Sequence, residues 1–259
     1  MPDLDHIRLD HIRIVLVETT HPGNIGSAAR AMHTMGLSQL HLVNPRTFPS
    51  DHATALASSA TALLDQAHIH STLDDALGDC QLVIATSSRA RHIPWPCISA
   101  RELGEHLGNL STSTNVEPNI AILFGREDRG LTNDELHRCN LHVTIPTNPD
   151  YGVLNVAAAV QVICYELRLA LTNDSTPSHH PHQRTLPNIP WDQPPASHQD
   201  IQRMLTHLER VMTQTGFLHP DHPGHVMTRL QRLFLRAQPD DTEINILRGL
   251  LTAIEKQRS

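Results

Sequence analysis

The chain lacks the features that mark membrane, secreted and disulfide-bonded proteins. No apolar run is long enough to span a bilayer, and residues 1–10 are mixed and acidic rather than basic and then apolar. We therefore expect neither a membrane span nor a signal peptide, which leaves the cytoplasm as the expected compartment. The four cysteines lie far apart and form no C-x-x-C pair. We expect reduced, mostly buried thiols rather than disulfides or structural zinc.

Two nucleotide-binding signatures are also missing. The segment after the first strand-like run, ETTHPG at 18–23, does not fit the G-x-G-x-x-G fingerprint of dinucleotide-binding folds. The lysine of a P-loop is absent too, because Lys256 is the only lysine in the chain. An ATPase is therefore not expected, and a nicotinamide-dependent oxidoreductase is a distant alternative.

The charged residues of the chain point both against and toward binding of nucleic acid. The net charge of −7 argues against a protein coated in basic surface for nucleic acid. However, all basic side chains but one are arginine, and arginine binds phosphate through a planar, two-pronged contact that lysine cannot copy. A GC-rich genome would produce the same bias, so both interpretations stay open at this point.

Histidine is abundant, but no metal site is predicted. Metal ligands need fixed geometry and supporting hydrogen bonds. Several of the 20 histidines fall in two loop-like stretches that contain no neighbouring cysteine and no Glu-x-x-His pattern: His179, His180, His182, His219, His222 and His225. We expect these side chains to be solvated or locally hydrogen-bonded.

Residues 11–168 alternate between strand-like and helix-like segments. Short apolar runs predict buried strands at 12–18, 39–43, 82–86, 119–124 and 141–145. Residues at helical spacing, most of them apolar, predict two helices, one through Ile25, Ala28, Ala29, Met32 and His33, the other through Leu154, Ala157, Ala158, Gln161, Val162, Tyr165 and Leu169. This alternation predicts an α/β fold with a mostly parallel sheet and helices on both faces.

The C-terminal third has a different character. Residues 172–198 are rich in Pro, Ser, His and Asn without periodicity, which predicts a linker. Three helices should follow: one capped by Asp200 and ending near Gln214, one from Pro223-Gly224 to about Ala237, and one starting at Asp240 or Asp241. We therefore divide the chain into an α/β domain (1–171), a linker (172–198) and a small all-helical domain (199–259).

Three segments predict one binding site. The segments are HPGNIGSAAR at 21–30, FGREDRGLTNDEL at 124–136 and IPTNPDYGVLNVAAAV at 145–160. Each follows an apolar, strand-like run and then breaks into Gly, Asn, Pro or charged residues before a helix-forming stretch. Strand, tight turn and helix is how an open α/β sheet builds a ligand crevice at the carboxyl ends of its strands.

The first of these segments has the features of an anion site. Gly23 and Gly26 permit close backbone approach, Asn24 can cap the helix, and the helix N-terminus offers N–H groups to an anion. Arg30 lies about two turns further on, beside small alanines. From the residues alone, Arg30 is equally a phosphate ligand or an ordinary exposed arginine.

The other segments have plainer explanations as well. The mixed charges of 125–131 are typical of a salt-bridged turn, and Asn155 is placed to hydrogen-bond neighbouring backbone. One further strand ends in small hydroxyls and two arginines, which would form a polar rim: Thr86, Ser87, Ser88, Arg89 and Arg91.

In order and spacing, these segments resemble the SPOUT (TrmH-like) superfamily of RNA methyltransferases, and the whole chain is similar to the TrmJ-type tRNA ribose 2′-O-methyltransferases. The motifs are IRIVLVETTHPGNIGSAARAM, LVNPR, TSSRAR with PWP, FGREDRGLTNDEL and NPDYGVLNVAAAVQVICYE. HPGHVMTRLQRLF and EINILRGLLTAIE extend the likeness into the C-terminal helices. The resemblance therefore covers the chain outside the linker.

The resemblance implies a trefoil-knotted α/β domain that binds S-adenosylmethionine (AdoMet) and acts as a homodimer on tRNA, usually at nucleotide 32 of the anticodon loop. It assigns catalysis to Arg30. Where the family often has a Ser-Ser pair, this chain has Gly152-Val153, so a hydroxyl contact would be lost while backbone contacts could survive. The implied cofactor residues are Thr86, Ser87, Ser88, Gly125, Ile145, Gly152, Val153 and Leu154.

Candidate RNA contacts lie in both parts of the chain. Arg229, Arg232 and Arg236 follow i, i+3, i+7 spacing opposite apolar residues, so they form either a solvated helix face or a tRNA backbone contact. The remaining candidates are Asn24, Arg89, Arg91, Glu127 and Asn155. Besides the oxidoreductase, two alternatives remain open: a methyltransferase of the same superfamily acting on another tRNA position or on rRNA, and a non-catalytic RNA- or AdoMet-binding module.

Overall fold

The fold is that of a computed structural model, which describes residues 9–87, 95–109, 118–172, 193–219, 221 and 224–256. Within these ranges, seven strands form one wholly parallel sheet in the order β3-β2-β1-β6-β4-β7-β5. The strands are β1 (Ile12–Val17), β2 (Gln39–Val43), β3 (His68–His70), β4 (Leu82–Thr86), β5 (Cys97–Ser99), β6 (Ile120–Phe124) and β7 (Leu141–Thr144).

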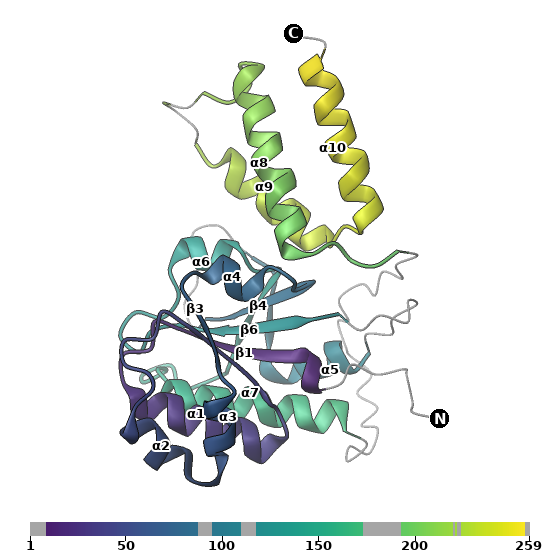
Figure 1. The fold of residues 1–259 in the computed structure, drawn as a ribbon. Helices are drawn as coiled ribbons and strands as arrows, with labels where there is room; N and C mark the ends of the chain where they lie inside the picture. The colour runs from purple at the N-terminus through teal and green to yellow at the C-terminus, as the bar shows by residue number, and fades with distance from the viewer. Residues whose placement is uncertain are drawn as a thin grey trace.

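Helices cover both faces of the sheet and also build a separate C-terminal unit (Figure 1). Those of the α/β domain are α1 (Pro22–Met35), α2 (Asp51–Ala57), α3 (Thr61–Asp65), α4 (Leu73–Leu77), α5 (Ala100–Gly108), α6 (Asn133–His137) and α7 (Val156–Leu171), with short 3₁₀ turns at Leu9–His11 and Ser58–Ala60. The C-terminal unit consists of α8 (His198–Gln214), α9 (Val226–Ala237) and α10 (Asp241–Lys256).

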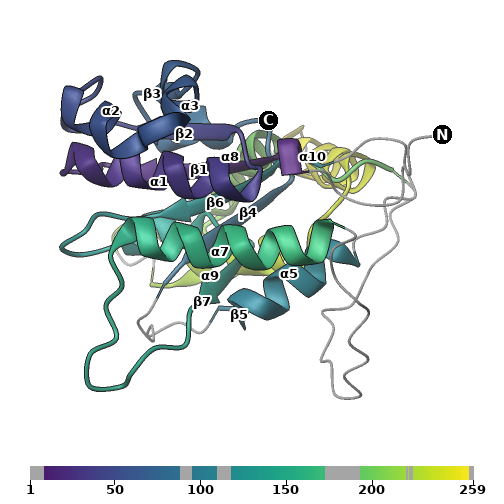
Figure 2. The same cartoon turned by 90° about the horizontal axis from the view of Figure 1, so that it is seen from below.

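Each face of the sheet has its own apolar core, because successive side chains of a strand point to opposite sides. Ile12, Ile14 and Leu16 of β1 pack with the layer that contains α1 and α7, which lie side by side in Figure 2. Val15 and Val17 point the other way, into the smaller core under α4 and α6. Strands buried on both faces read as nearly continuous apolar runs. All five strands predicted from the sequence are present in the sheet.

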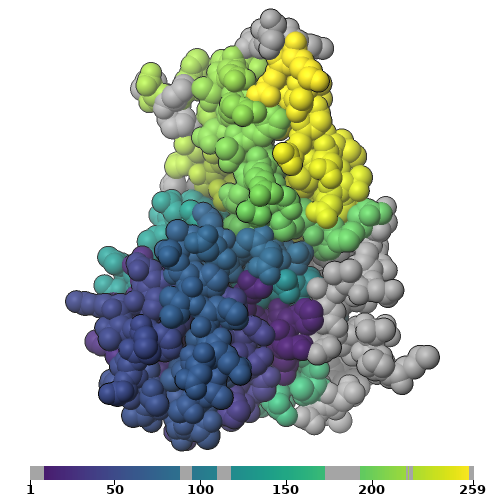
Figure 3. All heavy atoms as spheres, viewed as in Figure 1, coloured from purple at the N-terminus to yellow at the C-terminus, as the bar shows by residue number. Residues whose placement is uncertain are grey.

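The C-terminal helices stand on the α4 and α6 side of the α/β domain (Figures 1 and 3). They enclose a core of their own, which includes Ile201, Met204, Leu205, Leu235 and Ile244. We call α8, α9 and α10 with the preceding residues 193–197 the C-terminal module. Among the described residues, no helix has the length and apolar character needed to cross a bilayer.

The positions at which the helices of the module begin correct one expectation and confirm another. Ser197, not Asp200, is the N-cap of α8, and its hydroxyl accepts a hydrogen bond from the Asp200 N–H (3.2 Å). The two residue types cap equally well, so their order could not be told from the sequence. At α10, Asp240 accepts from the Glu243 N–H (2.8 Å), and the helix begins at Asp241 as expected.

Several other expectations were incomplete. The strands β3 and β5, of three residues each, were not predicted. The stripe expected on α7 is partly exposed, since Ala158 and Tyr165 face solvent. The end of the predicted linker belongs to the module, where Ala196 is buried and its N–H donates to the Pro239 carbonyl. Ser88, Arg89, Arg91, His179, His180, His182, His222 and linker residues 173–192 lie outside the described residues.

Gly26 gives a direct test of the packing between α1 and α2. A Cβ atom at Gly26 would lie 2.0 Å from the Ala53 carbonyl oxygen of α2, so Gly26→Ala forces the helices apart. Overpacking of this kind typically costs roughly 1–3 kcal/mol of unfolding free energy, to be measured by urea denaturation. Gly249 of α10 has nothing within 4 Å of a Cβ atom. Gly249→Ala should therefore leave stability unchanged or raise it by up to about 1 kcal/mol, and equal losses in both variants would contradict this packing.

Candidate active site

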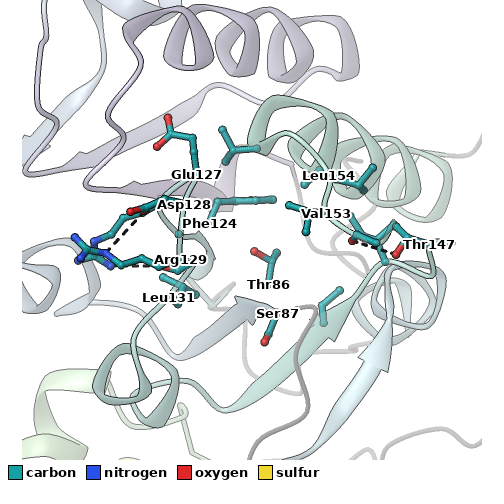
Figure 4. A pocket seen from close by; sticks show the side chains of 18 residues that line it. Thr86, Ser87, Phe124, Glu127, Asp128, Arg129, Leu131, Thr147, Val153 and Leu154 are labelled. Atoms are coloured by element: carbon teal, nitrogen blue, oxygen red, sulfur yellow. Dashed lines mark hydrogen bonds and ion pairs between the residues drawn. The ribbon is translucent and has the colours of Figure 1, made fainter. Parts of the chain in front are cut away.

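A pocket of about 180 Å³ opens where β4, β6 and β7 end. Thr86 and Phe124 are the last residues of β4 and β6, and Ile145 directly follows β7. Figure 4 shows the loop with Glu127, Asp128 and Arg129 on one side, the loop with Thr147, Val153 and Leu154 on the other, and Thr86 and Ser87 between them. Seven of the residues expected to hold the cofactor line this one pocket: Thr86, Ser87, Gly125, Ile145, Gly152, Val153 and Leu154.

The pocket has an apolar floor and a polar rim. Phe124, Leu131, Val143, Val156 and Ala159 supply the apolar lining. The hydroxyl of Thr86 donates to the Leu123 carbonyl oxygen at 2.8 Å, which fixes its rotamer at the base of the pocket. Val153, which lines the pocket, is 68% exposed, and Tyr151, two residues before it, is 81% exposed. A ligand or a protein surface that covered them would bury apolar area.

Glu127 ties two loops to the start of α1. One carboxylate oxygen accepts hydrogen bonds from the Thr20 N–H (3.1 Å) and the Thr20 hydroxyl (2.8 Å). The other accepts from the His21 N–H (3.2 Å) and the Asn24 side-chain amide (2.9 Å). The Asn155 amide then donates to Asn24 Oδ1 at 2.9 Å, which brings in the start of α7.

This arrangement corrects the anion site expected at 21–26. The N–H groups in front of α1 are engaged by an anion of the chain itself, the Glu127 carboxylate. Asn24 does not cap α1, because His21 is the N-cap and Asn24 binds Glu127 instead. Gly23 and Gly26 face α2 rather than a ligand. The first segment therefore orients the site from outside the pocket.

The hydrogen bonds also set the ionisation of Glu127. Burial alone would raise its pKa, but the bonds from Asn24 and Thr20 outweigh burial and lower the pKa to about 2. Glu127 is therefore charged at neutral pH. Glu127 lines the pocket, but its charged carboxylate is turned to the residues before and at the start of α1, which hold both of its oxygens.

Arg126 confirms the salt-bridged turn. Its buried guanidinium binds Glu18 at 2.7 Å and both oxygens of Glu135 at 2.9 and 3.0 Å. Its pKa is raised by hydrogen bonds first to Glu18 and then to Glu135. The turn can close only at a glycine, since a Cβ atom on Gly125 would lie 2.2 Å from the Gly130 carbonyl carbon. Arg126 therefore holds β1, the 125–131 loop and α6 together.

Gly152, which stands where the related family often has a serine, lies beside the hydroxyl of Thr147. The Thr147 hydroxyl donates to the Gly152 carbonyl oxygen at 3.1 Å. A Cβ atom at Gly152 would lie 2.9 Å from that hydroxyl oxygen, so a serine side chain would crowd it. Thr147 also lines the pocket. A hydroxyl is thus present next to this position although residue 152 carries none.

The residue expected to be catalytic and those expected to contact RNA lie outside the pocket or on its border. Arg30 is exposed on α1 and is not among the residues that line the pocket. Asn24, Glu127 and Asn155 meet in the hydrogen-bonded chain described above, so they build the site from within. Arg229 and Arg236 are exposed on α9 and Arg232 is half-buried there. Asn155 is also the N-cap of α7, as expected, and accepts from the Ala157 N–H at 2.9 Å.

Several residues of the site were not singled out from the sequence. Glu18 and Thr20 follow β1, Phe124 ends β6, and Thr147 follows β7. Their common signal is position, since each lies at or just after the carboxyl end of a strand. Treating every such residue as a candidate would have found them.

Comparison with known proteins agrees with this geometry. Residues 11–165 match the SpoU rRNA Methylase family, and residues 199–259 match the C-terminal domain of the tRNA methyltransferase TrmJ. The chain belongs to the SpoU methylase family. It is therefore an enzyme of a methyltransferase family, and the C-terminal match is to the TrmJ group.

Relatives in this family match over nearly their whole length. The tRNA (cytidine/uridine-2'-O-)-methyltransferase TrmJ of Cronobacter sakazakii is 49% identical over 252 residues, which are 97% of this chain and 98% of the relative. The protein of the same name from Escherichia coli K12 is 48% identical over 250 residues, 96% of this chain and 97% of its own length. The crystal structure of TrmJ from Z. mobilis ZM4 is 31% identical, with a TM-score of 0.77 over 94% of this chain and 98% of that one. The α/β SPOUT fold is confirmed.

The ionisation of Glu127 leads to a pH-dependent prediction. Its folded pKa, about 2, lies below its ordinary value of 4.5, so its stabilising effect is present above pH 4.5 and lost as the pH falls toward 2. The loss of unfolding free energy caused by Glu127→Gln should therefore be largest at neutral pH and shrink across that range. Denaturant unfolding at several pH values measures it. Glu209→Gln, at an exposed carboxylate of α8, is the control, and a loss at Glu127 that is constant with pH would contradict the assignment.

Proposed function

We propose that this enzyme transfers a methyl group from AdoMet to a ribose 2′-hydroxyl of tRNA. Two observations support the proposal together. Relatives that are 48–49% identical over nearly the whole chain carry the name tRNA (cytidine/uridine-2'-O-)-methyltransferase TrmJ. The residues that the family resemblance assigns to the cofactor converge on one pocket at the strand ends. A tRNA substrate would place the enzyme in the cytoplasm.

We further propose nucleotide 32 of the anticodon loop as the target, in line with the resemblance of the sequence to TrmJ-type enzymes. Another tRNA position or an rRNA site remains the alternative within the same chemistry. A module without catalysis was suggested by the Gly152-Val153 departure. The Thr147 hydroxyl beside Gly152 weakens that reason, because the pocket still has a hydroxyl there.

The pocket suits AdoMet by the chemistry of its walls. Its apolar floor fits a planar adenine ring, and the loops at 125–131 and 145–154 offer backbone groups for polar contacts. This assignment gives the cofactor to the seven lining residues Thr86, Ser87, Gly125, Ile145, Gly152, Val153 and Leu154. Ser88, outside the described residues, belongs to the same assignment.

Arg30 is the proposed catalytic residue. Bound AdoMet supplies a methyl group on a sulfonium, which is a strong electrophile. A ribose hydroxyl is a weak nucleophile, and its oxygen must lose a proton as the new O–CH₃ bond forms and the S–CH₃ bond breaks. Arginine remains charged at all ordinary pH values. We therefore assign Arg30 to grip the adjacent phosphate and stabilise the developing alkoxide, while a phosphate oxygen or water takes the proton.

A homodimer would complete this site. Arg30 is exposed and lies outside the lining of the pocket in its own chain. Tyr151 and Val153 are exposed and offer apolar area to a second surface. In the proposed assembly, the Arg30 side chain of a second copy faces this pocket, and RNA and cofactor meet near the subunit boundary. The division into an AdoMet-binding methyltransferase domain at 1–171, a linker at 172–198 and a C-terminal helical domain at 199–259 belongs to the same proposal.

Two measurements test the function. Methyl groups from labelled AdoMet should appear in bulk tRNA when the full chain is added, and no transfer would leave only the non-catalytic alternative. Ribose-methylation mapping on tRNA from cells with and without the protein should then show a loss at nucleotide 32. A loss at another position or in rRNA would refute the proposed target while keeping the chemistry.

The role of Arg30 predicts a separation of binding and catalysis. Arg30→Lys keeps a positive charge but loses the two-pronged phosphate contact. We expect tRNA affinity to change little and kcat to fall roughly 10²–10³-fold, the usual loss when one preorganised group is removed. Arg101→Lys, at an exposed arginine of α5, serves as the control. Near-normal turnover in Arg30→Lys would refute the role.

The arginines of α9 predict a salt effect. If Arg229, Arg232 and Arg236 contact tRNA phosphates, replacing all three with Gln should flatten the slope of log affinity against log salt by roughly one unit per lost contact. Filter binding over a range of salt concentrations measures the slope, with Arg101→Gln as the control. An unchanged slope would mean that the stripe is only a solvated helix face.

A further inference from the structure

Asn140 joins the α/β domain to the C-terminal module through a buried amide. It is 4% exposed and lies directly before β7. Its Oδ1 accepts from the Val83 N–H at 2.7 Å, and its own N–H donates to the Val83 carbonyl at the same distance. Its Nδ2 donates to the Leu235 carbonyl oxygen of α9 at 2.9 Å. One side chain therefore bonds two domains at once.

The bond to Leu235 answers a requirement of the helix end. In an α-helix the carbonyl of residue 235 would accept from the N–H of residue 239. Residue 239 is a proline and has no N–H group. Leu235 is fully buried, so water does not replace the missing donor. A buried carbonyl needs a partner, and the Asn140 amide is the donor that reaches it.

Three further contacts hold the module against the α/β domain. The first N–H groups of α8 extend to the α/β domain, from His198 to the Cys80 carbonyl (2.7 Å) and from Gln199 to the Gly78 carbonyl (3.2 Å). Trp95 packs against the core of the module, and its indole N–H donates to the Cys139 carbonyl at 2.7 Å. Asn140 is the residue among these whose own side chain makes the bond to α9.

The strands held by Asn140 lead directly to the pocket. Val83 lies in β4, which ends at Thr86, and β7 begins one residue after Asn140 and leads to Ile145. At about 3.3 Å per residue, the amide and the pocket are separated by roughly 10 Å of paired strand. The module is thus fixed to the opposite ends of the strands that form the pocket.

We infer that Asn140 is a positioning residue that sets the distance and orientation of the α9 arginines relative to the reacting centre. This inference rests on the proposed tRNA methylation. With Asn140 in place, a tRNA bound by the module presents its target ribose at one fixed position over the pocket. Without the amide donor, the module can shift, and the bound tRNA is misplaced while the pocket itself stays intact.

Asn140→Asp tests the inference because it keeps the shape of the side chain and removes the donor. Above neutral pH, the introduced carboxylate faces the Leu235 carbonyl, and the module should shift. In a Trp191→Phe background, Trp95 is the one tryptophan left. We expect its emission to move to longer wavelength and KM for tRNA to rise tenfold or more, with the AdoMet Kd within about twofold of wild type. Asn245→Asp on the exposed side of α10 makes the same chemical change without touching the joint.

Acidification gives a second readout that general damage would not produce. A protonated carboxyl group can donate to Leu235 and still accept from Val83, so Trp95 emission in Asn140→Asp should return toward the wild-type value as the pH is lowered. The wild type and Asn245→Asp are measured at each pH, since His137 and His142 stack against Trp95. If Asn140→Asp does not fold, Asn140→Ala removes the donor without adding charge, and the same emission and KM changes are expected.

The outcomes separate this inference from the proposed function. Unchanged emission and unchanged KM for tRNA in both Asn140 variants would overturn the positioning role, as would AdoMet affinity that falls in step with tRNA affinity. If the wild type transfers no methyl group to tRNA, the proposed function fails. The emission of Trp95 then still decides whether Asn140 holds the module in place.

Discussion

The Glu127 carboxylate is the interaction on which the site depends. Its two oxygens accept four hydrogen bonds from the turn before α1 and from Asn24. Through Asn24 the same network reaches Asn155 at the start of α7. Loops from three strands, far apart in sequence, are therefore held by one charged group. A charge in this position compensates the N–H groups of the turn, which would otherwise need water or an external anion.

The charged motif at 126–129 is divided between structure and surface. Arg126 is fully occupied by Glu18 and Glu135, and Glu127 by the turn before α1, so neither is spare for a ligand. Asp128 and Arg129 remain exposed at the rim. Apolar side chains and the hydroxyls of threonine and serine line the pocket beside this charged loop. The densest cluster of charge in the sequence thus shapes the pocket wall, and its outer members face solvent.

Five strands of four to six residues could be predicted from the sequence, because burial on both faces leaves a nearly continuous apolar run, interrupted by single polar residues such as Arg13 and His41. The sequence did not predict β3 and β5, since three residues are too few to show a period. It also misjudged Gly26, because a glycine that admits a neighbouring helix looks the same as one that admits a ligand. The pairing of Glu127 with Thr20 spans more than a hundred positions, and no local pattern carries that information. The family resemblance supplied the grouping of pocket residues that periodicity could not.

The place of β1 in the sheet has a consequence for synthesis on the ribosome. β1 lies between β2, which follows it closely, and β6, whose residues emerge about a hundred positions later. Parallel partners this distant pair only after a long loop has closed. During translation the early half of the sheet therefore has an unpaired apolar edge along Ile12–Leu16 until residues 120–124 leave the exit tunnel. An unpaired edge of this kind favours association with other chains, so the arrival of β6 is the step that closes it.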